Sequence, residues 1–330
     1  MTGGFEMLRS KAVDVATIWW ELVRIILPVA IVTEIMMRAG VIGAIAPAFR
    51  PLMDFYGLPA ELAFALLAGL LMGIWNAALL LFVLVPAGDL SVADVTVFSA
   101  LILFAHALPI EQQIIRRAGP GLILTTALRL AGGLSYAAML HALLRATGWL
   151  AKPVAPAWMP LAEDTGWAGF LIGLAQAMAM MFVILSVLML LMAMLRRLGL
   201  MALLQRGLAP VLRLAGIRGE AVPLTVIGLL LGISYGGGLL IHEARAGRIP
   251  PRQVLLACVF MGFAHSIIED TLIVMALGAD GGAVLAGRIV FAMAVTAALA
   301  AVLNRLPDRR IAALMPGNRA GVPRPPGNAA

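Results

Sequence analysis

The chain has 330 residues, of which 62% are hydrophobic and 12% are charged, and its mean hydropathy is +1.01. This composition excludes an ordinary soluble domain and predicts an all-α polytopic membrane protein. The net charge of +7 does not indicate a nucleic-acid-binding protein, because the basic residues lie scattered between apolar segments. The single cysteine, Cys258, excludes an intrachain disulfide and a cysteine-based metal cluster.

Residues 1–145 contain six predicted elements, which we assign from the length of each apolar run and the charges that interrupt it. They are a short interfacial helix, a span, a second interfacial helix, a hairpin, an interrupted span and a final span, over residues 2–12, 15–38, 41–55, 59–87, 92–117 and 122–145.

A linker loop over residues 146–166 leads to a second set of elements over residues 167–305. These are a span, an interfacial helix, a hairpin, an interrupted span and a span, over residues 167–195, 198–214, 219–245, 252–276 and 282–304. The Gly- and Pro-rich composition of the end of the chain predicts a disordered tail, residues 306–330, on the cytoplasmic side.

The second set of elements repeats the first in sequence at a constant offset. The tripeptide Phe104-Ala105-His106 recurs as Phe263-Ala264-His265, and the segments 57–111 and 216–270 align without a gap and share a quarter or so of their residues. Apolar composition alone does not align His, Arg, Glu and Gly residues in register. Duplicated hydrophobic halves with interrupted segments at matching positions are typical of secondary transporters.

Glycines interrupt the predicted hairpins near their middle, at Gly73 and at Gly232, with Gly236, Gly237 and Gly238 following in the second copy. These segments are either broken spanning helices or re-entrant hairpins with the glycines at the tip. Hairpins give each repeat three crossings, so that the second repeat is inverted and most basic residues gather on one side. The positive-inside rule therefore favours hairpins, with both termini in the cytoplasm of a bacterial inner membrane.

Ionisable residues inside the spans mark a candidate site, because such groups are costly in hydrocarbon. One group is His106, Glu111 and Gln112, and the other is His265, Ser266, Glu269, Asp270 and Thr271. We expect the groups to meet near the middle of the membrane, opposite the hairpin tips, where Asn76, Ser234 and Tyr235 add hydrogen bonds. The alternative is a buried polar network that locks the repeats together.

Two arginines, Arg129 and Arg288, lie at matching positions within spans. They either neutralise Glu111 and Asp270 or hold an anionic substrate, and the presence of the two acids favours charge pairing. A divalent cation is a further alternative ligand, with weak candidate ligands in His106, His265, Glu269 and Asp270.

Residues 228–238 (GLLLGISYGGG) and 263–271 (FAHSIIEDT), with weaker first copies at 69–76 and 104–112, resemble the gate-domain, or nucleoside recognition, family of membrane proteins. That family includes the spore maturation proteins A and B. It resembles more distantly the core of concentrative nucleoside transporters and the gate motifs of ferrous iron transport protein B. The resemblance implies a substrate site between the hairpin tips and the interrupted spans. The residues that it nominates are Asn76, His106, Glu111, Gln112, Ser234, Tyr235, His265, Glu269 and Asp270.

The leading functional hypothesis is therefore a transporter that moves a small polar solute, with nucleosides among the candidates, by alternating access and with a proton or cation as coupling ion. A divalent metal-ion permease and a non-transporting membrane scaffold or partner subunit remain alternatives. No Ser–His–Asp set, phosphate loop or HExxH motif occurs in the sequence, so we expect no enzymatic activity and no resident cofactor. The expected partners are the lipid bilayer, a small solute or ion and a second copy of the chain.

Overall fold

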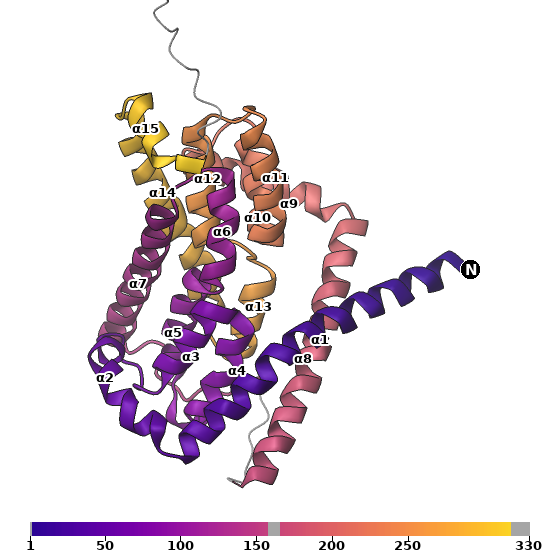
Figure 1. Cartoon of the computed structure of the whole chain (residues 1–330), viewed down its shortest axis with the longest axis vertical. Helices are drawn as coiled ribbons and strands as arrows, with labels where there is room; N and C mark the ends of the chain where they lie inside the picture. The colour runs from indigo at the N-terminus through magenta and orange to yellow at the C-terminus, as the bar shows by residue number, and fades with distance from the viewer. Residues whose placement is uncertain (1, 158–165, 318–330) are drawn as a thin grey trace, which may run out of the picture. The chain divides into compact units, whose positions relative to one another are not determined.

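The structure is a computed structural model that describes residues 2–157 and 166–317, and these residues form helices joined by loops (Figure 1). The one β-type pairing in them is an isolated bridge between Ser91 and Pro153. The predicted all-α fold is confirmed for this part of the chain.

The helices of the first half recur in the same order in the second half. The first half contains α1 (Thr2–Arg38), α2 (Val41–Phe55), α3 (Leu62–Met72), α4 (Ile74–Leu84), a short 3-10 turn η1 (Ala87–Asp89), α5 (Val92–Ala105), α6 (Leu108–Ala118) and α7 (Leu122–Thr147). The second half contains α8 (Trp167–Arg197), α9 (Leu200–Leu214), α10 (Ala221–Leu231), α11 (Ile233–Arg245), α12 (Pro251–Phe263), α13 (Glu269–Ala276), a π-helical turn η2 (Gly282–Gly287), α14 (Arg288–Asn304) and α15 (Asp308–Leu314). For α2 and α9, and for α3 and α10, the offset that relates His106 to His265 holds at both ends of the helix.

The segments predicted as hairpins fold back on themselves at a single glycine. Gly73 and Gly232 have φ values of 110° and 94°, a region that L-residues with side chains rarely adopt. Gly73 separates α3 from α4, and Gly232 separates α10 from α11. A Cβ added to Gly69 would lie 2.8 Å from the Cβ of Ala77. Residues eight apart in a continuous helix are about 12 Å apart, so α3 and α4 form an antiparallel hairpin.

The second hairpin is packed more closely than the first. The backbone of Gly236 in α11 lies directly against that of Gly228 in α10, and a Cβ on either glycine would collide with its surroundings. The prediction that Gly236, Gly237 and Gly238 form the hairpin tip is wrong, because they lie inside α11. The missing side chain of Gly236 allows the two helices to approach each other.

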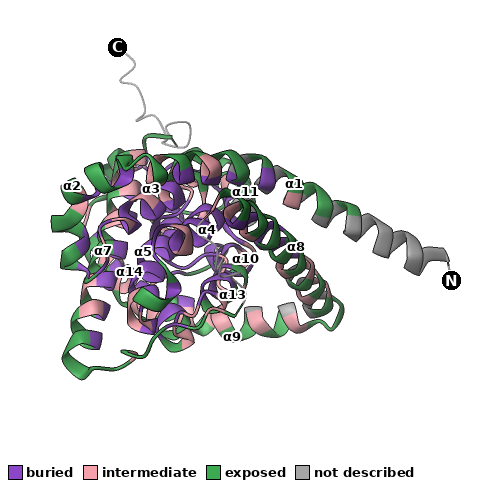
Figure 2. Cartoon of the chain, turned by 90° about the horizontal axis from the view of Figure 1, so that it is seen from below, coloured by how far each residue is buried: buried purple, intermediate pink, exposed green. Residues whose placement is uncertain are grey.

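Four helical segments are long and apolar enough to cross a membrane among the residues that the structure describes: Val92–Ala118, Leu122–Thr147, Trp167–Leu191 and Gly282–Asn304. Ile26–Arg38 and Val41–Phe55 pass the same test only as a pair bent by 94°. The first helix of this pair is the end of the span predicted over residues 15–38. That predicted span carries three charged residues, Glu21, Arg24 and Glu34. Many residues of α8 are exposed or half-buried, as expected for a helix with lipid around it (Figure 2). The chain is thus a helical membrane protein.

Two terminal predictions differ from the structure. The short helix predicted over residues 2–12 is the beginning of α1, which continues to Arg38. Residues 308–314 of the predicted disordered tail form α15, because Arg252 Nη2 donates a hydrogen bond to the Leu306 carbonyl and Ile311 is buried. Residues 318–330 of the tail and 158–165 of the predicted linker lie outside the described residues.

The chain divides into two compact units, each assembled from both repeats. The first comprises residues 1–102, 137–203 and 272–280, and the second comprises 103–136, 204–271 and 281–330. The second unit therefore contains α6 of the first repeat together with the α10–α11 hairpin and most of α12 to α14 of the second. The boundaries predicted from the sequence follow the repeats instead, and they remain predictions.

Candidate functional site

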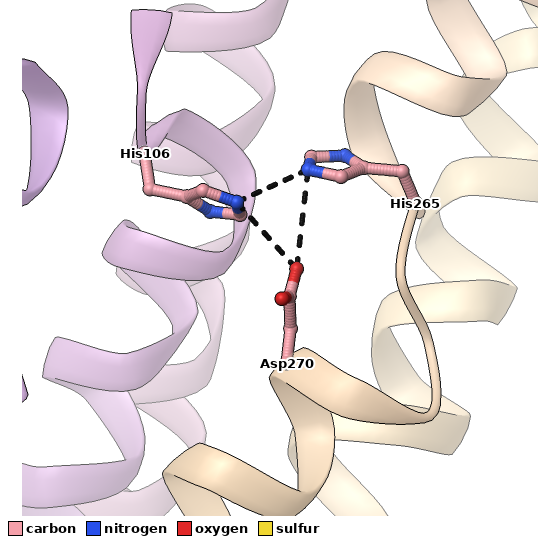
Figure 3. A group of neighbouring side chains, drawn as sticks. All are labelled: His106, His265 and Asp270. Carbon is pink, nitrogen blue, oxygen red and sulfur yellow. Dashed lines mark hydrogen bonds and ion pairs between the residues drawn. The ribbon is translucent and has the colours of Figure 1, made fainter. Parts of the chain in front are cut away.

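The site is built at the points where the two interrupted helices break, within the second unit. His106 follows the end of α5 and His265 follows the end of α12, and Asp270 lies in the first turn of α13 (Figure 3). The residue after each histidine, Ala107 and Ser266, has a left-handed backbone with φ values of 48° and 46°. Non-glycine residues rarely adopt this conformation, and such strain is concentrated at functional sites.

The polar atoms of the two repeats converge on one another. His106 Nε2 lies 3.1 Å from His265 Nε2, and Asp270 Oδ2 lies 3.5 Å from the first and 3.9 Å from the second (Figure 3). Glu111 Oε1 lies 3.2 Å from His265 Nε2 and 3.7 Å from His106 Nε2. We name His106, Glu111, His265 and Asp270 the histidine–carboxylate cluster. The two histidines and Asp270 are at most 5% exposed.

The hydrogen bond of His265 Nδ1 determines which tautomer the ring adopts. Its Nδ1 lies 2.9 Å from the backbone carbonyl of Met261, one turn earlier in α12. A carbonyl oxygen only accepts hydrogen bonds, so Nδ1 carries a proton. In the neutral ring Nε2 then carries a lone pair, which is directed at His106 Nε2 and the rest of the cluster.

Arg129 holds the first break in place. Its Nε donates a hydrogen bond to the Phe104 carbonyl at 2.5 Å, and its Nη2 donates to the His106 carbonyl at 3.1 Å. These carbonyls are freed where α5 ends, and water is not available inside a membrane to satisfy them. Nη1 also lies 2.5 Å from Glu111 Oε2, so that the predicted pairing of Arg129 with Glu111 is present.

Arg288 repeats this arrangement at the second break with one difference. Its Nε donates to the Phe263 carbonyl at 2.8 Å, and its Nη2 lies 3.3 Å from the His265 carbonyl and 2.8 Å from that of Leu103. Among the described residues, however, Arg288 forms no ion pair within 4.0 Å, and its Nη1 lacks a hydrogen-bond partner. The predicted pairing of Arg288 with Asp270 is therefore not seen. Asp270 Oδ2 accepts no hydrogen bond from the part of the chain that the structure describes, and it faces the two histidines instead.

The structure describes only some of the other nominated residues in the unit that holds the cluster. Gln112 is buried and accepts a hydrogen bond from Thr125 Oγ1 at 2.8 Å, whereas Glu269 is exposed at the beginning of α13. Asn76 belongs to the other compact unit, where its Nδ2 donates to the Met72 carbonyl at 3.3 Å. Ser234 and Tyr235 lie in the first turn of α11, and their side chains are outside the described part of the structure.

The tip of the second hairpin lies against the second break. A Cβ built on Gly232 would lie 2.7 Å from Ser266 Oγ, and the Ile267 amide donates to the Leu229 carbonyl at 2.9 Å. A Cβ on Gly237 would lie 2.6 Å from Ile114 Cγ2, so α11 also packs against α6 of the first repeat. The hairpin therefore supports helices that carry both halves of the cluster.

Sequence reasoning missed Tyr136 and Phe291, which complete an aromatic group with Phe104 and Phe263 beside the cluster. The rings of Phe104, Phe263, Tyr136 and Phe291 pack with centroids 5.2–6.4 Å apart. Tyr136 also donates a hydrogen bond to the Ala283 carbonyl at 2.6 Å. Phe104 and Phe263 precede the two histidines by two residues, and this repetition was the available signal.

Comparison with known proteins finds a family model and a relative that match parts of the chain. Residues 178–280 match the Gate family, described as nucleoside recognition. An uncharacterized membrane protein of Bacillus subtilis (strain 168), YvoD, is 28% identical over 290 residues, which cover 85% of this chain and 90% of that protein. No solved structure matches the chain. The Gate match includes α10 to α13, and hence His265 and Asp270. Residues 178–280 of the chain are thus similar to the Gate family, whose description is nucleoside recognition.

Proposed function

We propose that this membrane protein is a transporter of the bacterial inner membrane, without enzymatic activity, which binds a small polar solute or ion at the histidine–carboxylate cluster. The observation that carries the proposal is the contact of His106 and His265 at the breaks of two interrupted helices, with Asp270 between them. Discontinuous helices of this kind supply ion and substrate ligands in secondary transporters.

Transport accounts for the cluster better than a locking role does. Buried ion pairs contribute little net stability, and apolar residues of similar volume often replace them without loss. Here Asp270 Oδ2 accepts no hydrogen bond from the described residues, and Ala107 and Ser266 keep strained backbones on both sides. A purely structural network gains nothing from a buried carboxylate oxygen without a hydrogen bond or from strain, whereas a binding site uses both.

The surroundings of the cluster favour a polar ligand over a nucleobase. The rings of Phe104, Phe263 and Tyr136 are at most 2% exposed and pack against one another and Phe291, so they offer no exposed face. A base would need a free aromatic face on which to stack. The description of the Gate family as nucleoside recognition therefore does not identify the substrate of this chain.

The proposal includes an orientation. The charge asymmetry of the loops favours cytoplasmic termini and two repeats of opposite orientation. Alternating access then moves the repeats relative to each other around the cluster, with a proton or cation as coupling ion. Pairing with a second copy of the chain remains a prediction.

Uptake into proteoliposomes tests the proposal. We would reconstitute the purified full-length protein and measure uptake of radiolabelled nucleosides, carboxylic acids and divalent cations, with and without a pH gradient. The variant that carries both His265→Ala and Asp270→Asn removes two groups of the cluster. His242→Ala is the matched control, because His242 is an exposed histidine outside the cluster.

Transport predicts that at least one solute enters vesicles containing the wild-type protein or His242→Ala, and that the double variant inserts in the membrane but does not take it up. Equal uptake by the double variant would remove the cluster from the mechanism. Failure of the wild-type protein to take up any of these solutes would favour the scaffold or partner-subunit alternative.

A further inference from the structure

We propose that His106, His265 and Asp270 form a binding site for a divalent transition-metal ion, with Glu111 available as a fourth ligand. The inference deepens the proposed function by naming the ligand class of that same site. It rests on the proposed function only for the location of the site, because metal binding is measured without transport.

The donor atoms have the chemistry that such ions prefer. The cluster offers two imidazole nitrogens and carboxylate oxygens, a set that suits Zn²⁺, Fe²⁺, Mn²⁺ and Co²⁺. Mg²⁺ and Ca²⁺ prefer a shell made entirely of oxygen ligands. We therefore expect the site to select the first group over the second.

The spacing of the donors fits an ion without rearrangement. His106 Nε2, His265 Nε2 and Asp270 Oδ2 form a triangle with sides of 3.1, 3.5 and 3.9 Å. The circle through three such points has a radius of about 2 Å, which is the usual metal–nitrogen and metal–oxygen distance for zinc. A triangle with Glu111 Oε1 in place of Asp270 has sides of 3.1, 3.2 and 3.7 Å and gives a similar radius, about 2 Å.

His265 is already oriented as a metal ligand. Its Nδ1–H donates to the Met261 carbonyl, so that the lone pair of Nε2 is directed at the cluster. Metal-binding histidines almost always donate their other ring N–H to a carbonyl or carboxylate, and this bond fixes both tautomer and orientation. The arrangement therefore exists before an ion arrives.

The nearby arginines do not prevent a cation from binding. Arg129 is paired with Glu111, which leaves Glu111 Oε1 on the side of the histidines. The guanidinium of Arg288 lies against the carbonyls of Phe263, His265 and Leu103. The C-terminal ends of α5 and α12 also direct their partial negative charge to this region. A proton shared between the two Nε2 atoms is the competing occupant.

Direct metal analysis tests the proposal. The full-length protein, purified in detergent with an affinity tag that contains no histidine, would be dialysed to equilibrium against Zn²⁺, Mn²⁺ or Mg²⁺. Bound metal would then be counted by elemental analysis. His106→Gln replaces the imidazole nitrogen by a weakly binding amide, and Asp270→Asn removes the negative charge of the carboxylate while keeping its shape. His242→Ala controls for surface histidines, and a melting curve of each variant controls for folding.

The proposal predicts one tightly bound Zn²⁺ or Mn²⁺ per wild-type chain and per His242→Ala chain, and at least a tenfold weaker affinity in the two cluster variants. Mg²⁺ should not compete. The proposal is overturned if the folded wild-type protein binds no transition metal, or if the cluster variants bind Zn²⁺ or Mn²⁺ as tightly as the wild type. Uptake of a metal-free solute together with no metal binding would refute this inference alone. Metal binding without uptake of any solute would refute the transport proposal alone.

Discussion

The Nε2 atoms of His106 and His265 lie 3.1 Å apart although the two residues are 159 positions apart in the chain. Each histidine follows the same Phe-Ala dipeptide, precedes a left-handed residue and has its carbonyl near an arginine from the span that follows, Arg129 or Arg288. The duplication therefore generates the site directly, because matching residues of the two repeats become neighbours. The repeats differ in their acids, since Glu111 is paired with Arg129 whereas Asp270 faces the histidines.

Replacing Arg129 alone should destabilise the protein more than replacing Arg129 and its partner Glu111 together. Arg129→Met leaves Glu111 as a buried charge without its arginine, which typically costs about 3–5 kcal/mol. The double variant Arg129→Met with Glu111→Gln should recover part of this loss, because the uncompensated carboxylate is gone. Unfolding in detergent, followed by helical circular dichroism, measures the difference.

The solvent-accessible pair formed by Arg248 and Glu243 provides the control for that experiment. Arg248→Met should change stability little, because exposed ion pairs contribute little. Equal losses for Arg129→Met and Arg248→Met would show that the buried pair has no special role.

Gly236 should not tolerate alanine, whereas Gly238 in the same helix should. A Cβ on Gly236 collides with the backbone of Gly228, which has no flexible end that can move aside, while a Cβ on Gly238 meets nothing within 4 Å. We expect Gly236→Ala to lower the free energy of unfolding by about 1–3 kcal/mol through overpacking. Gly238→Ala should be neutral or gain up to about 1 kcal/mol. The melting temperatures of the two variants test this difference. A Gly236→Ala protein as stable as the wild type would contradict the close packing of the hairpin.

Ala107→Gly should relieve strain at the first break. Glycine adopts a φ of 48° readily, so the variant should be as stable as the wild type or more stable by up to about 1 kcal/mol. Ala127, an exposed residue inside α7, has ordinary helical surroundings, and Ala127→Gly should lose about 1 kcal/mol. If both variants lose the same amount, the left-handed conformation at Ala107 is not present in the protein.

Cysteine labelling should place the loop that follows the first hairpin and the loop that follows the second on opposite sides of the membrane. Gly88 and Ala246 are exposed, and the native Cys258 is buried and gives little background. In cells, a membrane-impermeant maleimide should label Gly88→Cys from the outside. Ala246→Cys should react only after the cells are opened. Labelling of both from the same side would contradict the inverted orientation of the repeats.

Much of the fold could be predicted because the bilayer constrains the sequence strongly. Apolar runs and the repetition of Gly73 as Gly232 indicated the helices and the position of both hairpin tips. The function of the glycines at 236–238 could not be predicted, because the same residues serve a turn or a close helix contact. Only the partner helix, with Gly228 against Gly236, distinguishes the two.

The candidate site was predicted as a set of residues but not as a geometry. Intramembrane charge and duplication together indicated His106, His265 and Asp270. They did not indicate that Asp270 would face the histidines instead of Arg288, because this depends on where α12 ends and α13 begins. The loop of residues 264–268 is longer than the break after α5, and no hydrophobic pattern determines its path.

The most direct test of the account is an X-ray absorption spectrum of the zinc-loaded protein, compared with that of His106→Gln at the same zinc occupancy. If His106 and His265 act on one ligand, the wild-type spectrum should show only nitrogen and oxygen neighbours, at the usual zinc distance of about 2 Å, with the outer-shell signals of two imidazoles. The His106→Gln spectrum should show one. A wild-type spectrum with fewer than two imidazoles, or one that His106→Gln leaves unchanged, would contradict the claim that the two repeats share a single site.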